Sequence, residues 1–187
     1  MPTQLVTLSN AKAWFATSGT PLPSTDDALL TRLILACSGA IEAWLNRTIA
    51  ATNYTWTGAG TGSSRLLLPN YPVQSVASLT VDGVAVLPSA GYGLAGYAFD
   101  EFGLWRIGGV FTRGVRNVVV TYNAGFATVP PEIEQACIAT VALRYRERER
   151  IGHASKSLAG ETVAFTIVDF PAEVKTLLRN YRKVVPL

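Results

Sequence analysis

Residues 26–47, which read DDALLTRLILACSGAIEAWLNR, decide the character of the helical part of this chain. Asp26 and Asp27 suit the first turn of a helix, where the helix dipole favours negative charge, and Ser24 or Thr25 is a suitable cap. The apolar residues recur at steps of three and four: Leu30, Leu33, Ile34, Cys37, Ile41, Trp44 and Leu45. This spacing predicts a helix over 25–46 with one broad buried face.

Helices are also predicted on both sides of this stretch. A short one over 9–18, capped by Ser9, precedes the breaker run Gly19–Pro23. A third, over 131–150, begins at the second proline of Pro130-Pro131, because proline suits the first helical turn.

The C-terminal segment, residues 153–187, is predicted to form an arm followed by a helix. Residues 152–160 are small and read as a linker, and 161–168 read as a strand or extended arm. Asp169 is a candidate cap for a final helix begun by Pro171.

Short β-rich runs separated by Gly, Ser, Pro and Asn fill the chain between about 50 and 126. Asp82-Gly83 predicts a two-residue hairpin turn, because both residues tolerate a positive φ. Phe102-Gly103 indicates a second tight turn. The predicted strands are 53–57, 65–68, 75–81, 84–87, 97–99, 104–107 and 115–122.

The fold class predicted from this order is α+β. We expect an antiparallel bundle of about four helices with an inserted small antiparallel β-sheet or half-barrel. The expected division is a connector domain over 1–152 and a C-terminal arm and helix over 153–187.

Charge is scarce and unevenly placed. Charged residues make up 16% of the chain and hydrophobic ones 49%, whereas an average soluble domain has roughly 25% charged residues. Because large exposed apolar patches usually mark interaction surfaces, this composition favours a subunit of an assembly. Residues 1–143 carry seven Lys/Arg and eight Asp/Glu, while 144–187 carry nine and five, so the basic excess lies near the C-terminus.

The sequence contains no strong motif for catalysis, cofactor binding or metal binding. Gly91–Gly96 has the letters of a dinucleotide fingerprint, but turn and strand residues surround it in place of the required strand and helix. Cys37 and Cys137 match no metal-ligand spacing and are expected to be buried thiols, and His153 is the only histidine. We expect no enzyme activity, no cofactor and no metal. No segment is expected to reach the length of a membrane span, and the chain is expected to be made in the cytosol.

Candidate interface residues are cationic or aromatic. The densest charged run spans 144–150; it fits either a solvated helix end or a contact with a neighbouring subunit, a partner ring or passing DNA. The full candidate set is Arg144, Arg146, Arg148, Arg150, Lys175, Arg179, Arg182, Lys183, Trp56 and Trp105.

Three fragments in series resemble the head–tail connector proteins of tailed phages, also called head-completion or DNA-packaging adaptors. The first combines Leu8–Ala13, Asp26–Ile34 and Ile41–Arg47, and the second is Tyr71–Gly83. The third combines Val119–Gly125, Val129–Cys137 and Arg144–Arg148. The resemblance therefore spans residues 8–148.

This resemblance implies a helical bundle with a β insertion, assembled as a ring, commonly of twelve copies, under the portal in the virion neck. Double-stranded DNA would pass through the ring without sequence readout, and a tail-side protein would dock below. Residues 153–187 are similar to the C-terminal arm with which longer relatives grip the portal or a neighbour. The family offers no catalytic residues.

Two other function classes stay open. A nucleic-acid-binding packaging factor would act through 144–150 and the C-terminal lysines, and would show strongly salt-dependent DNA affinity. A small-molecule-binding enzyme would use the Gly91–Gly96 loop.

Overall fold

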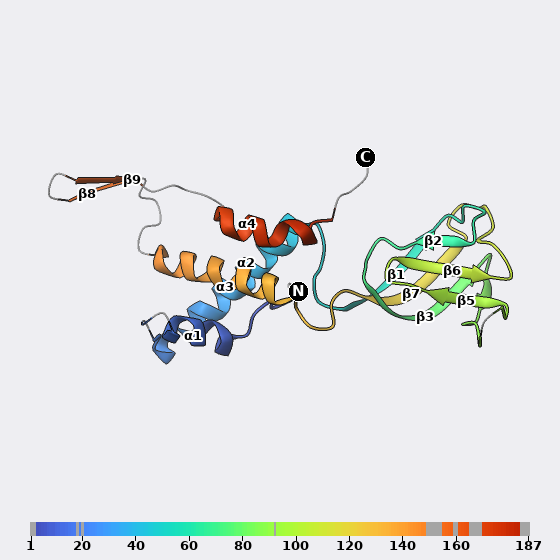
Figure 1. The fold of residues 1–187 in the computed structure, drawn as a ribbon, viewed down its shortest axis with the longest axis horizontal. Coiled ribbons are helices and arrows are strands. Elements are labelled where there is room, and N and C mark those ends of the chain that lie inside the picture. The colour runs from blue at the N-terminus through green and yellow to red at the C-terminus, as the bar shows by residue number, and fades with distance from the viewer. Residues whose placement is uncertain are drawn as a thin grey trace. The chain divides into compact units, whose positions relative to one another are not determined.

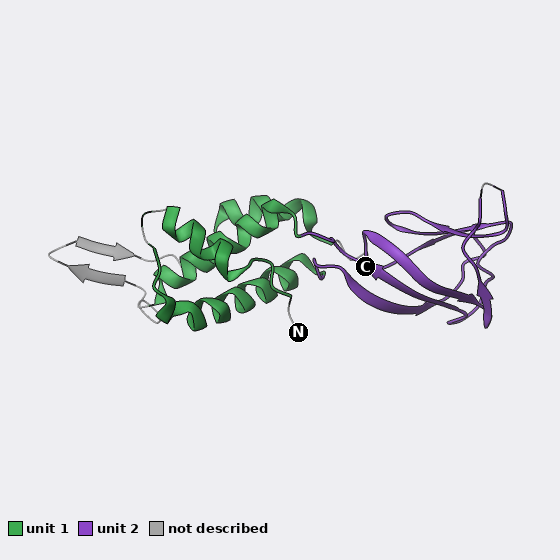
Figure 2. Cartoon of the chain, turned by 90° about the horizontal axis from the view of Figure 1, so that it is seen from below, with its two compact units in different colours: residues 1–47, 129–187 green, residues 48–128 purple. Residues whose placement is uncertain are grey.

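The computed structural model describes residues 3–17, 19, 21–91, 93–148, 155–158, 161–164 and 170–183, with backbone only for 155–158 and 161–164. The chain divides into two compact units. Unit 1 comprises residues 1–47 and 129–187, and unit 2 comprises 48–128. Figures 1 and 2 show that the described part of unit 1 is built mainly of helices, whereas unit 2 is built of strands.

Helix α1, Leu8–Thr17, begins one residue earlier than predicted. The Thr7 hydroxyl accepts a hydrogen bond from the Asn10 backbone N–H at 3.2 Å. Thr7 therefore caps the helix, and the predicted cap, Ser9, lies inside the first turn. Ala11 and Phe15 are the buried residues of α1.

Helix α2, Asp27–Leu45, follows a single 3₁₀ turn, η1, at Ser24–Asp26. The Asn46 N–H donates to the Ala43 carbonyl and the Arg47 N–H to the Glu42 carbonyl, with Asn46 at φ 57°. This is the Schellman arrangement, in which a left-handed residue closes the helix. Leu33 and Trp44 of the predicted buried face are half-buried. The face is confirmed at the other five positions, which are Leu30, Ile34, Cys37, Ile41 and Leu45.

The segment Ser24–Leu45 is long and apolar enough to cross a membrane by length and composition alone. The expectation that no segment reaches that length was therefore wrong, because Arg32 and Glu42 interrupt the run too little. The central helix of a packed bundle passes the same test, and here α2 packs against α1 and α3.

Helix α3, Pro131–Arg146, ends earlier than the predicted residue 150. The Arg148 guanidinium donates to the Tyr145 carbonyl at 2.8 Å and lies 4.1 Å from the centre of the Tyr145 ring. Since a side chain satisfies a carbonyl of the last turn, the helix stops there. The arginines of 144–150 are thus not all on one helix, and Arg150 lies outside the described residues.

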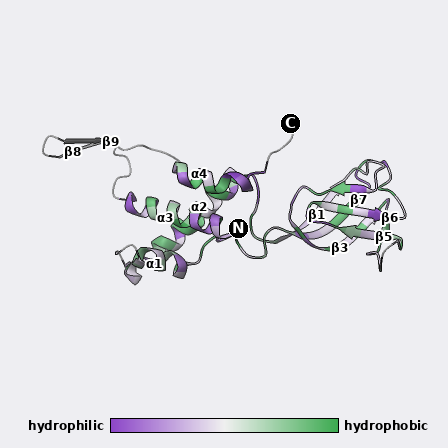
Figure 3. Ribbon diagram, in the orientation of Figure 1, coloured by the Kyte–Doolittle hydropathy of each residue, from purple (hydrophilic) through white to green (hydrophobic). Residues whose placement is uncertain are grey.

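The final helix, α4, spans Ala172–Leu178 and continues as a 3₁₀ turn, η3, at Arg179–Tyr181. Pro171 precedes it as predicted, and Asp169, the predicted cap, lies outside the described residues. Val174 and Leu178 are buried, and α4 packs against α3. Figure 3 shows that α1, α3 and α4 each carry hydrophobic and hydrophilic segments, as expected of helices with one buried face.

Part of the predicted linker is a strand. Ser155–Leu158 (β8) pairs antiparallel with Glu161–Ala164 (β9). Small polar residues have weak β propensity, so the presence of a pairing partner decides the conformation of 155–158.

Unit 2 contains two antiparallel sheets in its described residues. The four-stranded sheet has the order β1-β7-β3-β4 and the three-stranded sheet the order β2-β6-β5. Their bounds are β1 Thr52–Gly58, β2 Arg65–Leu67, β3 Val73–Val81, β4 Val84–Val86, β5 Gly96–Phe99, β6 Gly103–Ile107 and β7 Val118–Ala124. The last strand starts three residues later than predicted, because Arg116 takes a positive φ and Asn117 binds the neighbouring loops.

Both sheets contribute to one core. The inward side chains of β2, β5 and β6 meet those of β3 and β7, together with Phe111 from the segment between β6 and β7. Leu104, Phe111, Val118 and Val120 are fully buried. The predicted antiparallel β-sheet or half-barrel is thus a pair of antiparallel sheets with a shared core, inserted into the helical unit, and the α+β class is confirmed.

The two predicted turns are present. Asp82 and Gly83 have φ 52° and 78°, as a type I′ turn requires. Between β5 and β6, the Asp100 carboxylate accepts the N–H groups of Phe102 and Gly103, both at 2.8 Å. Asp100 is therefore a turn-forming residue.

Candidate functional site

The arginines at the end of α3 are held by aromatic rings. The Arg146 guanidinium lies 5.7 Å from the centre of the Trp14 ring, and Arg148 covers Tyr145 as described above. Arg144, Arg146 and Arg148 are all exposed. A cation on an aromatic face gains about 0.5–1 kcal/mol at an exposed site, so Arg146 and Arg148 have preferred positions.

The cations of the last helix lie on the side away from its buried face. Lys175, Arg179 and Arg182 are exposed, whereas Lys183 is half-buried and its N–H donates to the Leu45 carbonyl at 2.9 Å. Arg182 lies 5.1 Å from the centre of the Trp44 ring. This contact places the charge of Arg182, which follows η3, next to α2.

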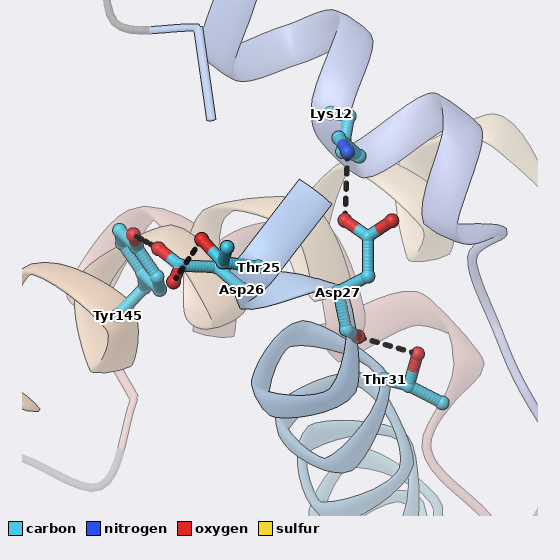
Figure 4. A network of polar contacts seen from close by, with 6 residues as sticks. All are labelled: Lys12, Thr25, Asp26, Asp27, Thr31 and Tyr145. Carbon is cyan, nitrogen blue, oxygen red and sulfur yellow. Dashed lines mark hydrogen bonds and ion pairs between the residues drawn. The ribbon is translucent and has the colours of Figure 1, made fainter. Parts of the chain in front are cut away.

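A polar network joins the N-terminal end of α2 to α1 and α3 (Figure 4). Lys12 Nζ lies 2.7 Å from Asp27 Oδ1, and the Tyr145 hydroxyl donates to Asp26 Oδ2. The Thr31 hydroxyl donates to the Asp27 carbonyl at 2.8 Å. The acidic first turn that was predicted from the dipole rule therefore also binds two other helices.

Trp105 lies on the outer face of the three-stranded sheet and is 40% exposed. Its indole N–H donates to Asp100 Oδ2 at 2.8 Å, and the Arg65 guanidinium stacks 4.8 Å from its ring centre. The Trp105 indole N–H, with the Phe102 and Gly103 amides and the Arg65 charge, lowers the pKa of the Asp100 carboxyl. The indole is thus fixed with one face available, an arrangement typical of interface hot spots.

Trp56 is half-buried on β1 and packs against the core of unit 2. A Cβ at Gly58 would lie 2.0 Å from the Trp56 ring, so glycine is required for this packing. The two candidate tryptophans therefore differ: Trp105 is presented outward, and Trp56 belongs mainly to the core edge.

Exposed large hydrophobic side chains, among the residues the structure describes, all lie in unit 2. Sequence reasoning missed most of them, although three successive leucines at 66–68 in a strand require one to face outward. They are Leu67, Val84, Leu87, Leu94, Phe99, Phe102, Trp105, Val110 and Val115.

The Gly91–Gly96 loop connects strands. Ser89 Oγ is placed 2.8 Å from the carbonyls of Gly91 and Leu94, and β5 follows the loop where a dinucleotide site would need a helix. The described residues of this loop therefore form a turn between strands.

The cysteine thiols are buried in unit 1. Burial raises the pKa of Cys37 to about 11 and that of Cys137 to about 12. Both remain protonated near neutral pH, which confirms that they act as small buried groups. His153 lies outside the described residues, and within those residues no group of three His, Cys, Asp or Glu side chains could hold a metal ion.

A family model described as head completion protein matches residues 4–184. The chain belongs to the head completion protein family. The family resemblance predicted from residues 8–148 is thereby confirmed, and so is its consequence, a structural protein of the virion.

Two solved structures share the fold of this head completion protein. One, the neck of an empty GTA particle computed with C6 symmetry, is 21% identical, with a TM-score of 0.57 over 90% of this chain and 85% of that chain. The other, the neck of a native GTA particle computed with C12 symmetry, is 17% identical, with a TM-score of 0.55 over 100% and 97%. A comparison with curated proteins gave no match.

Proposed function

We propose that this head completion protein is a head–tail adaptor that forms a homo-oligomeric ring in the virion neck, beneath the portal. The family match over residues 4–184 carries the proposal. The similar structures support it, because both come from necks treated with cyclic symmetry. In this role the protein completes the DNA-filled head, offers a docking site to a tail-side protein, and performs no catalysis.

Unit 2 is the proposed contact between copies. A cyclic ring needs a heterologous interface, in which two different patches of one subunit meet its two neighbours. The exposed apolar residues of unit 2 and the fixed Trp105 indole supply such a patch, since aromatic residues are enriched in interface cores. Trp56 contributes at the edge of the same unit.

Unit 1 supplies the proposed contact with an acidic surface of the portal. The residues assigned to this contact are the cations of 144–150 (Arg144, Arg146, Arg148 and Arg150) and those of 175–183 (Lys175, Arg179, Arg182 and Lys183). Residues 1–152 would form the body of the ring, and 153–187 the arm that grips the portal or a neighbour.

DNA would pass without sequence readout. Unit 2 has four arginines and three carboxylates in its sequence, so it adds little net positive charge to a channel. Each phosphate neutralised strengthens DNA binding, and a sliding DNA is best served by few such contacts. The exposed cations Lys175, Arg179 and Arg182 favour a second candidate, a nucleic-acid-binding packaging factor.

Native mass spectrometry of the protein, alone and mixed with its cognate portal, tests the proposal. We expect a ring species, alone or on the portal, with twelve copies as the specific expectation. A protein that stays monomeric with the portal present would contradict the ring. Strong DNA affinity that falls steeply with salt, in the absence of portal binding, would favour the packaging factor.

A charge placed on the apolar patch tests the role of unit 2. Leu67 is 61% exposed on the outer sheet face, so Leu67→Asp leaves the folded monomer largely unchanged and weakens assembly. Ser78→Asp adds the same charge to an exposed position of the other sheet and is the matched control. If both variants assemble equally well, the exposed apolar residues around Leu67 are not part of the interface between copies.

A further inference from the structure

Strand β1 is the longest edge strand described in unit 2. It has seven residues, against three each in β2 and β4. The outer edge of β5 is covered, because the Tyr97 N–H donates to the Leu87 carbonyl at 3.0 Å and the Ser89 N–H to the Tyr97 carbonyl at 2.8 Å. Among the described strands, β1 pairs with β7 alone.

The β1 edge also lacks the features with which proteins block unwanted strand pairing. Its sequence, TNYTWTG, contains no charge and no proline. Its register with β7 runs without a break from Thr52↔Ala124 to Gly58↔Val118, whereas the irregularities of this sheet lie between β3 and β7. An edge of this kind offers a row of backbone N–H and C=O groups to an incoming strand.

The β8–β9 hairpin could supply a strand to the β1 edge. Its four-residue strands pair with each other and form a two-stranded sheet of their own. An isolated two-stranded hairpin is marginally stable in water, and a third strand stabilises it. Eight residues separate the end of α3 from β8, and a chain of that length can reach up to about 26 Å.

We propose that the β8–β9 hairpin of one copy adds to the β1 edge of the neighbouring copy. This inference rests on the proposed ring and names the contact that links its subunits. Each copy donates one hairpin and receives one, so the two patches differ and the contact repeats around a closed ring. The affinity comes from hydrogen bonds between backbone groups of the two strands. The β1 edge can form such bonds because it carries no charged side chain that would oppose a second strand.

Cysteine pairs test the contact directly. The double variants Thr55→Cys/Ser157→Cys and Thr55→Cys/Thr162→Cys place one thiol on the β1 edge and one on a strand of the hairpin. The three single variants are the controls. After assembly with portal and mild oxidation, we expect a ladder of covalently joined copies in at least one double variant. Cys37 and Cys137 are buried and do not interfere. Three outcomes would overturn the proposal: cross-links only within one chain, cross-links only to the portal, or no cross-links in either double variant although it assembles.

A charge on the β1 edge provides a second readout. Thr55→Lys introduces a residue that discourages strand addition, while Ser78→Lys adds the same charge on β3, away from that edge. We expect Thr55→Lys to raise the concentration for half-assembly by about tenfold or more, and Ser78→Lys to leave it near the wild-type value. Equal effects of the two variants would overturn the edge contact.

Failure of this inference is distinguishable from failure of the proposed function. If the wild-type protein forms no ring with the portal, the adaptor proposal fails. If the wild-type ring forms but the cysteine pairs do not link neighbouring copies, the adaptor proposal stands and the hairpin contact fails.

Discussion

The Tyr145 hydroxyl donates a hydrogen bond to Asp26 Oδ2 across 119 residues of sequence. Tyr145 is in the last turn of α3 and Asp26 immediately precedes α2. The whole β unit is inserted between these two helices, so this bond joins the two chain segments that flank the insertion (Figure 4). Asp27, the next residue, binds Lys12 of α1, and three helices therefore meet at adjacent carboxylates.

Tyr145→Phe should lower the free energy of unfolding by about 1.5–3 kcal/mol, because it removes a hydrogen bond to a half-buried carboxylate. Tyr181→Phe is the matched control, since the Tyr181 hydroxyl donates to Glu132 Oε2 at 3.0 Å in an exposed position, and we expect a loss below about 1 kcal/mol there. Urea unfolding followed by far-ultraviolet circular dichroism measures both. Equal losses would show that the Tyr145 bond adds no special stability.

Asn46 ends α2 with a left-handed backbone, φ 57°. Asn46→Gly should leave stability unchanged or improve it slightly, because glycine adopts this conformation without strain. Asn46→Val should cost about 1–2 kcal/mol, since a Cβ branch opposes the left-handed region. Thermal unfolding of the two variants gives the comparison, and a valine variant as stable as the glycine variant would contradict the strain argument.

Trp105→Phe should raise the pKa of the Asp100 carboxyl toward its ordinary value of 3.8, because the indole N–H is the main group that lowers it. A carboxyl with a lowered pKa stabilises the folded state above its unfolded pKa, and this contribution is lost as the pH falls through its folded pKa. The variant should therefore lose less stability on acidification. NMR titration of the carboxyl carbon measures the pKa directly. Asp82 is the internal control, because Thr112 and Asn117, which lower the pKa of Asp82, are unchanged.

Cys37 and Cys137 should resist thiol reagents in the folded protein. Burial raises the pKa of Cys37 from an ordinary value of 9.0 to about 11, so its thiolate fraction at pH 8 is about a hundredfold smaller. Ellman's reagent should react with both thiols only after unfolding. Because both pKa values are raised, the neutral thiols stabilise the fold below pH ~9, and that stability declines as the pH rises toward the folded values. Fast reaction of the native protein would contradict the buried placement.

The helices and strands followed largely from local sequence patterns. The three- and four-residue apolar spacing of 30–45 determines which face of α2 is buried, because it matches the helical repeat. Asp82-Gly83 determines a turn because few other pairs accept two positive φ values. The order helix, helix, β block, helix is therefore legible without a structure, and the family resemblance follows from the same fragments.

Individual side-chain and strand contacts decided what the sequence patterns leave open. Two helix ends depend on short-range contacts: Thr7 caps α1 in place of Ser9, and Arg148 binds the Tyr145 carbonyl at the end of α3, each pair being three residues apart. Ser155–Leu158 becomes a strand because Glu161–Ala164 lies beside it. Local patterns were sufficient to predict most of the helices and strands, the buried face of α2 and the family. The three-dimensional structure was needed to show which polar groups of distant segments meet, which apolar side chains are exposed on unit 2, and which described strand lies at the edge of its sheet, because these depend on residues far apart in the chain.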